Sequence, residues 1–582
     1  MAKLFLTITM LALALNLFSQ DNPAIEKPGK TYPALLDKEF EKGSRIKFPE
    51  LDEKLILDLA WLGKVWGFLK YNHPNLAEGT YNWDAELLRF LNIYLAVNDK
   101  ADREEFTLMW INCIGDISQF PKVKTKSKNT FSKQSLDWIE TMINDSSLKA
   151  KLYQIHERRN QGEHFYVGST PEIPTFTNED PYANLPYPDD GLRLLSLYRF
   201  WNIIDLYFPY KHLTDKNWDE VLIEYIPQFL GAKNELEYEL VVLKLIGEVH
   251  DTHANLWEGG NKLYHLNGEY YPPFHVRFVE NQLIVDDYFN PDKAEMTGVH
   301  IGDIITHING KSVEEIVDSL SIYYPVSNHA VRLREMSSDM LRSAKNEIDI
   351  EYKSSGASKK GKLTLYKKQD LNYYTWFKTS NPTGYNMLPN DILYLNLAFL
   401  NEIDYPTIEK YLISVKGVII DVRNYPNFLM WSLVPYFQTT KKPFARFTLR
   451  NIHNPGEFIW TEKIRIHRNK KPFSGKLIVL VNEITQSLGE LTAMAFKATG
   501  NATIIGSQTA GADGRIADIY LPGGLKTSIS GYGVYYPDKT ETQRIGIVPD
   551  IEVKPTIKGI KEGRDEVMER AMQILEEGAG KK

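Results

Sequence analysis

Cysteine is almost absent from this chain of 582 residues, which contains only Cys113. A single cysteine excludes any disulfide within the chain. Cys113 lies in an apolar pattern with helical spacing, so we expect its thiol to be buried. Strong clusters of basic residues are also absent and the net charge is −7, so nucleic acid is not an expected partner. The remaining composition is that of a globular chain long enough for three or four domains.

Long hydrophobic runs are absent beyond the N-terminus. An apolar run begins at Leu4 and gives way to small or polar residues after about 15 positions. This order predicts a signal peptide over residues 1–20, cleaved near Ser19 or Gln20, and hence a periplasmic or extracellular protein. A membrane anchor is the alternative, but the run is short for a bilayer, and no stable span is expected after cleavage. Residues 21–50, rich in Pro, Lys and Glu, predict a linker.

Residues 51–268 have a mainly helical pattern that contains an internal repeat, with copies at about 55–120 and 190–255. VWGFLKYNHPNLAEGTYNWDAELL, which starts at Val65, aligns without gaps on FWNIIDLYFPYKHLTDKNWDEVLI, which starts at Phe200. Each copy predicts a helix, a turn at proline and a second helix capped by Asn or Asp. We therefore expect two related helical subdomains that pack on each other.

The two copies differ at their ends. The second copy ends in GEVHDTHANLW, which supplies His250, Asp251 and His253, whereas the first ends in GDISQFPKVKT. One interpretation is a polar helix end, where histidine is favourable. A metal site is another, because two histidines are three residues apart, but no third or fourth ligand lies nearby. The third interpretation is a catalytic base.

Residues 270–370 predict a β-rich unit. Alternating apolar residues are interrupted at Glu280 and Asn281, as in a turn between two strands. The segment GVHIGDIITHING follows, and its Asn309-Gly310 pair is a hairpin signal.

Residues 371–575 alternate between buried strands and helices. The predicted strands cover 392–400, 415–423, 476–483 and 502–507. This alternation predicts an α/β domain with a mostly parallel sheet, whose functional site lies at the carboxyl ends of the strands.

Ser487 stands between the third of these strands and a predicted helix at 488–498. Ser is a preferred helix cap, and Glu490 three residues later completes a capping box. The nucleophile elbow Gly-x-Ser-x-Gly is only half present, since Gly489 is there but Thr485 replaces the first glycine. The local pattern favours a cap, although a helix N-terminus also stabilises a negative charge that forms beside it.

Three segments resemble one peptidase family. NEITQSLGELTAMAF followed by IIGSQTAG resembles the serine-containing core of the C-terminal processing (tail-specific) proteases and the tricorn core protease. Asp251-Thr252-His253 resembles the tricorn-like and retinoid-binding-protein-like branch of that family. The tail RIGIVPDIEV is similar to the final segment of the same family.

GVHIGDIITHING is similar to the core of a PDZ domain, which binds extended peptides by strand addition. A spacer without an open groove is the alternative for that domain.

The resemblance implies a role for each matched residue. Ser487 is the nucleophile, and His253, with Thr252 beside it, is the general base. The oxyanion hole takes the N–H of Leu488 and, where the family has glycine, Asn427 of the segment DVRNYPN. A Ser-Lys dyad is less favoured, because alanine occupies the position 25 residues after the serine and the nearest lysines, Lys497 and Lys526, lie outside any motif.

The group that orients His253 has three candidates. Gln543 is at the position where the tricorn-like branch has glutamate. Glu541 is two residues away and shares a strand face with it. Asp251 is closer in sequence, but residues two apart on a helix do not face each other. We therefore favour Glu541 slightly over Gln543.

Together these features predict a multidomain α+β protein: an N-terminal helical repeat, a PDZ-like β domain and a C-terminal α/β catalytic domain. The predicted function is that of a secreted serine endopeptidase acting on polypeptides or peptides, without a metal or another cofactor. The alternative is a disabled protease fold that binds peptides or small apolar ligands, for which the altered DVRNYPN segment argues. The sequence leaves the oligomeric state open.

Overall fold

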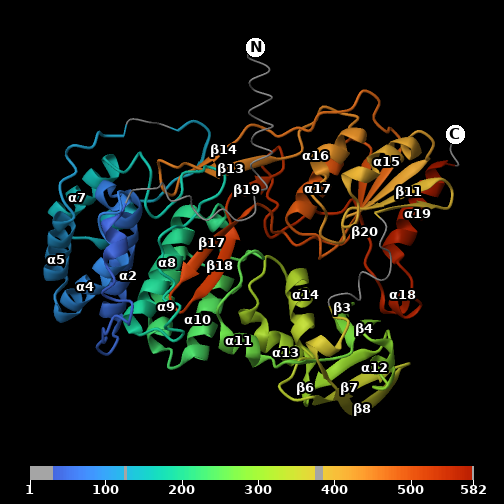
Figure 1. Cartoon of the computed structure of the whole chain (residues 1–582), viewed down its shortest axis with the longest axis horizontal. Helices are drawn as coiled ribbons and strands as arrows, with labels where there is room; N and C mark the ends of the chain where they lie inside the picture. Colours follow the sequence, from blue (N-terminus) through green and yellow to red (C-terminus); the bar gives the residue numbers. More distant parts are fainter. Residues whose placement is uncertain (1–30, 124–126, 374–383, 580–582) are drawn as a thin grey trace.

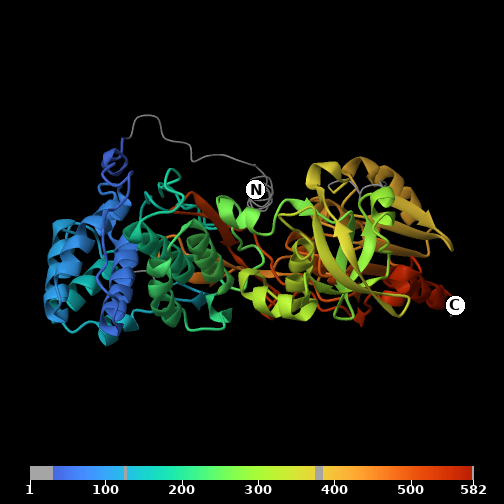
Figure 2. The same cartoon turned by 90° about the horizontal axis from the view of Figure 1, so that it is seen from below.

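The computed structural model describes residues 31–123, 127–373 and 384–579. The predicted signal peptide lies outside the described residues. The molecule is elongated, with a helical region at one end and an α/β region at the other (Figures 1 and 2). A β-rich unit lies beside the α/β region. Within the described ranges, no helix has the length and apolar character needed to cross a membrane.

The first part of the predicted linker that is described packs against the helical region. It contains a short 3-10 helix, η2 (Pro33–Leu36). The Ser44 hydroxyl donates to the Asp189 carboxylate at 2.7 Å, and Ile46 is buried in the helical core. Residues 33–50 are therefore part of the folded helical region.

The predicted repeat is present as two sets of helices in the same order. The first copy contains α2 (Glu53–Asn72), α3 (Pro74–Ala77), α4 (Trp83–Ala96) and α5 (Lys100–Cys113). The second contains α8 (Asp190–Tyr207), η3 (Lys211–Leu213), α9 (Trp218–Gly231) and α10 (Glu235–Gly247). Between them lie β1 (Thr130–Ser132), α6 (Asp137–Met142) and α7 (Ser146–Glu157).

The same pair of tryptophans fixes the helix pair in each copy. The Trp66 indole donates to the carbonyl of Trp83 at 3.1 Å, and the Trp83 indole donates back to Trp66 at 3.0 Å. Trp201 and Trp218 form the same reciprocal bonds at 2.6 and 3.0 Å. All four rings are buried, so each N–H needs an internal acceptor and finds it in its partner's backbone.

The thiol of Cys113 is exposed, contrary to the sequence prediction. Cys113 is the last residue of α5, and the helix buries Arg103, Glu104, Thr107 and Ile111 instead. The buried face of α5 is thus partly polar. The apolar pattern around Cys113 did not reveal which side of the helix faces the core.

The β-rich unit begins after α11 (Asn261–Leu266). Its sheet has the order β3-β4-β5-β7-β8, and β6 pairs with β5. The strands are β3 (Phe274–Val279), β4 (Gln282–Tyr288), β5 (Ile304–Ile308), β6 (Lys311–Ser312), β7 (Glu347–Ser354) and β8 (Ala357–Thr364). A separate two-stranded sheet pairs β2 (Tyr270–Tyr271) with β9 (Tyr366–Lys367) in antiparallel orientation. The helices of the β-rich unit are α12 (Pro291–Glu295), α13 (Val313–Leu320) and α14 (His329–Asp339).

Both predicted turns of this unit are confirmed by the backbone. Glu280 and Asn281 have φ values of 52° and 59° and connect β3 to β4. Asn309 has φ 48° and connects β5 to β6. Positive φ at the central residues matches the right-handed twist of paired strands, which is why these turns favour Asn and Gly.

The α/β region contains a six-stranded sheet of order β10-β11-β12-β15-β16-β20. β11 (Ile392–Asn396), β12 (Gly417–Asp421), β15 (Lys476–Val481), β16 (Ala502–Gly506) and β20 (Ile551–Glu552) are parallel, and β10 (Tyr385–Leu388) is antiparallel at one edge. The four predicted strands are therefore confirmed.

Helices cover both faces of this sheet. Alternate residues of β11, β12 and β15 pack on one side against α15 (Tyr405–Leu412), α16 (Met430–Leu433) and α17 (Leu488–Lys497). The other residues pack against α19 (Glu566–Ala579), which follows α18 (Ile557–Lys561). Burial on both faces explains why the strands are continuous apolar runs.

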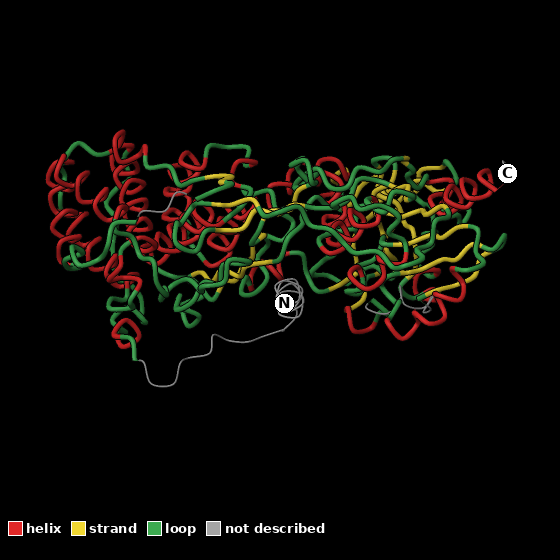
Figure 3. The backbone as a smooth tube through the Cα atoms, turned by 90° about the horizontal axis from the view of Figure 1, so that it is seen from above, coloured by secondary structure: helices red, strands yellow, loops and turns green. Residues whose placement is uncertain are grey.

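Part of the C-terminal region folds against the helical region. The hairpin β17 (Ile516–Leu521) and β18 (Leu525–Ser530) contributes Ile519 and Ile529 to the helical core. A second sheet of order β1-β14-β13-β19 joins β1 to β13 (Arg446–Arg450), β14 (Phe458–Trp460) and β19 (Gly533–Tyr535). The strands between the two ends of the molecule in Figure 3 belong to these segments. Residues 371–575 are therefore divided between the α/β region and the helical region of the molecule.

Candidate active site

Ser487 lies between the carboxyl end of β15 and the first turn of α17, as predicted. Its backbone has φ 54° and ψ −117°. A residue that only caps a helix normally has extended dihedral angles, whereas this conformation is strained for a residue with a side chain. Strain at a serine in a strand-to-helix turn is typical of a nucleophile elbow. The backbone conformation thus favours the elbow, which stays a prediction, whereas the local sequence favoured the cap.

The buried carboxylate of Glu490 holds this turn in place. Its oxygens accept the N–H groups of Ser487 at 3.2 Å, Gly511 at 2.8 Å and Ala512 at 3.0 Å, and also the Thr509 hydroxyl. Burial raises the pKa of Glu490, while these hydrogen bonds oppose the rise. The sequence predicted only its contact with Ser487. The three further bonds attach residues 509–512 to the turn.

His253 lies in a buried turn directly after the second helical copy. Its Nδ1 lies 3.0 Å from Ser530 Oγ on β18 and 3.4 Å from Asp251 Oδ1. Asp251 is fully buried and also accepts the N–H of His253 at 3.0 Å and of Ser530 at 2.8 Å. Burial would raise the pKa of Asp251, but the bonds with His253 and Ser530 lower it below its usual value. Asp251 therefore remains a carboxylate that can stabilise an imidazolium.

Thr252 connects this turn to the β-rich unit rather than to His253. Its hydroxyl and N–H lie 2.9 and 2.8 Å from the Ser327 hydroxyl, and the Ser327 N–H donates back to the Thr252 hydroxyl at 3.0 Å. The next residue, Asn328, caps α14 and donates to the carbonyls of Thr509 and Ala510 at 2.9 Å each.

The serine turn and the histidine turn meet the same segment. The Ser487 N–H donates to the carbonyl of Ala512 at 2.9 Å. A Cβ placed on Gly514 would lie 3.8 Å from the Cβ of Ser530, which is bonded to His253. No hydrogen bond between Ser487 and His253 is recorded in the described chain. Such bonds are often long without substrate and shorten in the complex.

Comparison with known proteins decides the family. The model of peptidase family S41 matches residues 392–553, which include β11 to β20 and Ser487. Residues 392–553 of the chain therefore form a peptidase family S41 domain. Its S41 domain is of the serine-peptidase type, and the resemblance seen around Ser487 is confirmed. The search of curated proteins returned no match.

Solved structures are similar to this chain at low sequence identity. Mature CPAF in complex with lactacystin is 12% identical, with a TM-score of 0.50, over 66% of this chain and 98% of that chain. A putative peptidase from Parabacteroides merdae ATCC 43184 is 17% identical, with a TM-score of 0.41, over 66% and 96%. The photosystem II D1 C-terminal processing protease is 18% identical, with a TM-score of 0.37, over 64% and 98%.

The acid nearest to His253 is Asp251, which the sequence analysis ranked below Glu541 and Gln543. Residues 251–254 form a turn, in which the Ala254 N–H donates to the Asp251 carbonyl at 2.8 Å. The helical argument against Asp251 therefore does not apply. Glu541 instead binds His212 Nε2 at 2.8 Å. Gln543 is buried, and its amide group has no hydrogen-bond partner among the described residues.

Asn427 cannot supply the second oxyanion donor predicted from the sequence. Its N–H donates to the carbonyl of Leu397 at 2.8 Å, and its side chain donates to the carbonyl of Leu400 at 2.8 Å. Both groups hold the DVRNYPN segment against the end of β11. The N–H of Leu488, the first residue of α17, has no acceptor within its own helix and remains the predicted backbone donor.

The alternatives that involve lysine or metal find no support in the geometry. Lys497 pairs with Asp550 at 2.9 Å, and Lys526 pairs with Glu258 at 2.9 Å. His250 turns to Asp215, 2.8 Å away, while His253 faces Ser530. Across the described ranges, no group of three or more His, Cys, Asp or Glu side chains is arranged to hold a metal ion.

Sequence reasoning missed Asp513 and Arg334. Asp513 follows the segment that Glu490 holds, and its Oδ2 is buried without a partner in the described chain. Burial and the nearby charge of Glu490 raise its pKa well above the usual range. Arg334 of α14 donates to the carbonyl of Glu483 at 2.7 Å and to Gln486 at 3.1 Å, on the approach to Ser487. Neither belongs to a motif, although the acidic residue in TAGADG follows a predicted strand.

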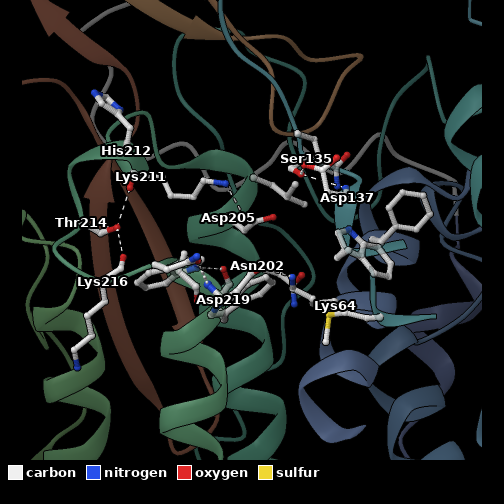
Figure 4. Close-up of a pocket in the computed structure, with 18 of the residues that line it drawn as sticks. Lys64, Ser135, Asp137, Asn202, Asp205, Lys211, His212, Thr214, Lys216 and Asp219 are labelled. Carbon is white, nitrogen blue, oxygen red and sulfur yellow. Dashed lines mark hydrogen bonds and ion pairs between the residues drawn. The ribbon is translucent and has the colours of Figure 1, made fainter. Parts of the chain in front are cut away.

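A pocket of about 580 Å³ lies between the two helical copies (Figure 4). None of the predicted site residues lines it. Two ion pairs lie among its lining residues: Lys64 is 2.7 Å from Asp219, and Lys211 is 2.7 Å from Asp205. His212 at its rim holds Glu541, which explains why that carboxylate is not at His253.

Proposed function

We propose that the chain is a secreted serine endopeptidase that acts through Ser487, His253 and Asp251. Ser487 Oγ attacks the peptide carbonyl while His253 Nε2 takes its proton, and Asp251 stabilises the imidazolium at Nδ1. The proton then passes to the leaving amine as the acyl-enzyme forms. Water, activated by the same imidazole, hydrolyses the ester and restores Ser487.

The strained backbone of Ser487 is the observation that carries this proposal. A helix cap gains nothing from φ 54° and ψ −117°. The strain persists because Glu490 and the carbonyl of Ala512 both bind the Ser487 N–H. Such a turn exposes the hydroxyl beside the positive end of α17, where negative charge develops during acyl transfer.

The β-rich unit is proposed to be a PDZ-like module that receives substrate. β3 is an edge strand of the described sheet, and an extended peptide can add to such an edge. Arg277 of β3 pairs with Glu483 at 2.9 Å, two residues after the end of β15. A peptide along β3 would thus lie near the approach to Ser487. Binding of labelled unfolded polypeptide to Ser487→Ala, with and without an amidated C-terminus, tests strand addition against carboxylate recognition.

A fluorophosphonate probe and a peptide substrate test the catalytic proposal. Ser487→Ala should lose both labelling and hydrolysis, while Ser432→Ala, a partly buried serine hydroxyl of the same domain bonded to Tyr405, should keep both. If Ser487 is only a cap, its substitution costs about 1 kcal/mol of stability and leaves activity intact. A wild-type protein that binds peptides but is neither labelled nor active would indicate the disabled binding protein instead.

A further inference from the structure

Of the two backbone donors predicted for the oxyanion, only that of Leu488 remains. Stabilisation of a tetrahedral intermediate requires donors about 2.7–3.1 Å from the position of the negative oxygen. Leu488 supplies one N–H. Pro426 has no N–H, and both donors of Asn427 are bound to carbonyls of the 397–400 segment. The loop that carries a glycine donor in the resembled family therefore offers no free N–H at these positions.

Tyr425 of the same loop reaches the serine turn with its side chain. Its hydroxyl lies close enough to the Ser487 side chain and to the backbone of Leu488 for both to lower the pKa of the phenol. The loop lies directly on the first turn of α17, because Pro426 Cδ is 3.6 Å from the place of a Cβ on Gly489. Tyr425 is nevertheless 60% exposed, so a substrate can approach the hydroxyl.

We propose that the Tyr425 hydroxyl is the second oxyanion donor of this site, replacing a backbone N–H with a side-chain O–H. The inference rests on the proposed peptidase function of Ser487. Without substrate, the phenol oxygen occupies the place beside the Leu488 N–H that a substrate carbonyl would take. When the carbonyl enters, it accepts the Leu488 N–H, and the phenol turns its O–H toward the same oxygen.

The phenol has the protonation state that this role requires. Burial raises the pKa of Tyr425, and the charge of Asp513 raises it further, whereas Ser487 and Leu488 lower it. The net effect is a rise, so the hydroxyl keeps its proton at neutral pH and can donate. No proton is transferred from Tyr425 in any step. It contributes a hydrogen bond that strengthens as charge develops on the oxygen.

Tyr425→Phe removes the O–H and keeps the ring. We expect the rate constant for fluorophosphonate labelling and the kcat for a peptide substrate to fall about 100- to 1,000-fold. KM and the melting temperature should change little. Tyr436→Phe is the matched control, because its hydroxyl is bonded to Glu409 in the same domain and lies outside the site. That variant should keep wild-type rates.

The outcomes separate this inference from the proposed function. If wild type is labelled and Tyr425→Phe is labelled at the same rate, Tyr425 is not a donor and only this inference fails. Faster labelling of Tyr425→Phe would show that the hydroxyl blocks the site, which also overturns it. If wild type itself is neither labelled nor active, both the peptidase function and the role of Tyr425 fall together.

Discussion

The two helical copies have the same scaffold and different ends. Both join their helices by reciprocal tryptophan bonds, and α2 of the first copy packs on α8 of the second. After α10 the second copy continues into the buried turn of Asp251 and His253. After α5 the first copy continues into a segment that buries Ile117 but exposes Asp116 and Ser118, where the Ser118 hydroxyl donates to Asp116.

The difference shows that the two copies share the residues that stabilise their helices and differ in the residues that follow them. The shared helices supply buried aromatic packing, which tolerates few changes. The residues that follow the last helix of each copy lie outside the reciprocal tryptophan bonds that the copies share, and they differ between the two copies. In the second copy these residues meet β18, and Ser530 joins the histidine turn through Nδ1 of His253 and the Asp251 carboxylate. The catalytic candidate therefore exists only where the C-terminal hairpin packs on the helical region.

The largest expected effect is a difference in kcat between substitutions of the acidic residues that follow the last helix of each copy. Asp251→Asn should lower kcat about 10,000-fold, because an amide neither stabilises the imidazolium nor fixes its tautomer. Asp116→Asn, at the corresponding end of the first copy, should leave kcat unchanged. Peptide hydrolysis at neutral pH measures both. An Asp251→Asn variant with wild-type kcat would remove Asp251 from the mechanism and return Glu541 and Gln543 to consideration.

A second contrast compares two reciprocal ion pairs between the copies. Arg199 binds Asp84 at 2.6 Å, and Lys64 binds Asp219 at 2.7 Å, with 135 residues between the paired positions. The Asp84 side chain is only 4% exposed and also binds Lys70, whereas Asp219 is 54% exposed. Asp84→Asn should therefore cost about 3–5 kcal/mol, since it leaves buried cations with less compensation. Asp219→Asn should cost less than about 1 kcal/mol.

Urea unfolding of the two variants measures this difference. Each substitution replaces a carboxylate by an amide of nearly the same shape, so packing changes are small and charge dominates. Equal losses of stability would mean that burial does not distinguish the two sites. The measurement thus tests whether the buried carboxylate of the first copy contributes more to the free energy of unfolding than its exposed counterpart in the second.

Most of the fold could be predicted from the sequence where one residue pattern decides one element. The repeated helix pairs, the buried parallel strands and the turns at Glu280-Asn281 and Asn309-Gly310 all appear as expected. Their signals are local, and the structure does not override them. The predicted burial of the Cys113 thiol was wrong, because tertiary contacts decide which face of α5 is buried, and that face is partly polar.

Of the proposed site, the sequence singled out Ser487 and His253, whose roles stay predictions. Ser487 and His253 carry motifs, but Asp251 was ranked too low because the sequence pattern suggested a helix where a turn exists. The position of Ser530 depends on the β17–β18 hairpin crossing to the helical region. No pattern along the chain reveals that crossing, because it depends on packing between segments more than 250 residues apart in the chain.

A smaller effect concerns the position that is His73 in the first copy and Phe208 in the second. His73 is fully buried, and neither ring nitrogen has a hydrogen-bond partner among the described residues. Burial, and then the charge of Lys151, lower the pKa of His73 to about 3. The unfolded chain has the usual value of about 6.5. Stability from this group is therefore full above about pH 6.5 and is lost as the pH falls toward 3.

His73→Phe should remove this acid sensitivity. Between pH 7.5 and pH 5, His73 alone accounts for about 2 kcal/mol of lost stability. The phenylalanine variant should lose correspondingly less over the same interval, although the buried ring of His164, whose pKa is also lowered to about 3, still contributes. Unfolding by urea at the two pH values measures the change. An unaltered pH dependence would contradict the assignment of the effect to His73.

The smallest expected effect is at Cys113, which aligns with Leu245 when the Ile114-Gly115 and Ile246-Gly247 pairs are matched. Leu245 is buried, whereas the Cys113 thiol is exposed. Cys113→Ser should change the free energy of unfolding by no more than about 0.5 kcal/mol. Leu245→Ala should cost about 2–5 kcal/mol, because it leaves a cavity. The exposed thiol should also react with a maleimide in the native protein at the rate of a free cysteine. Slow labelling that becomes fast only in urea would mean that the Cys113 thiol at the end of α5 is buried. The two copies would then be alike in burial at this position.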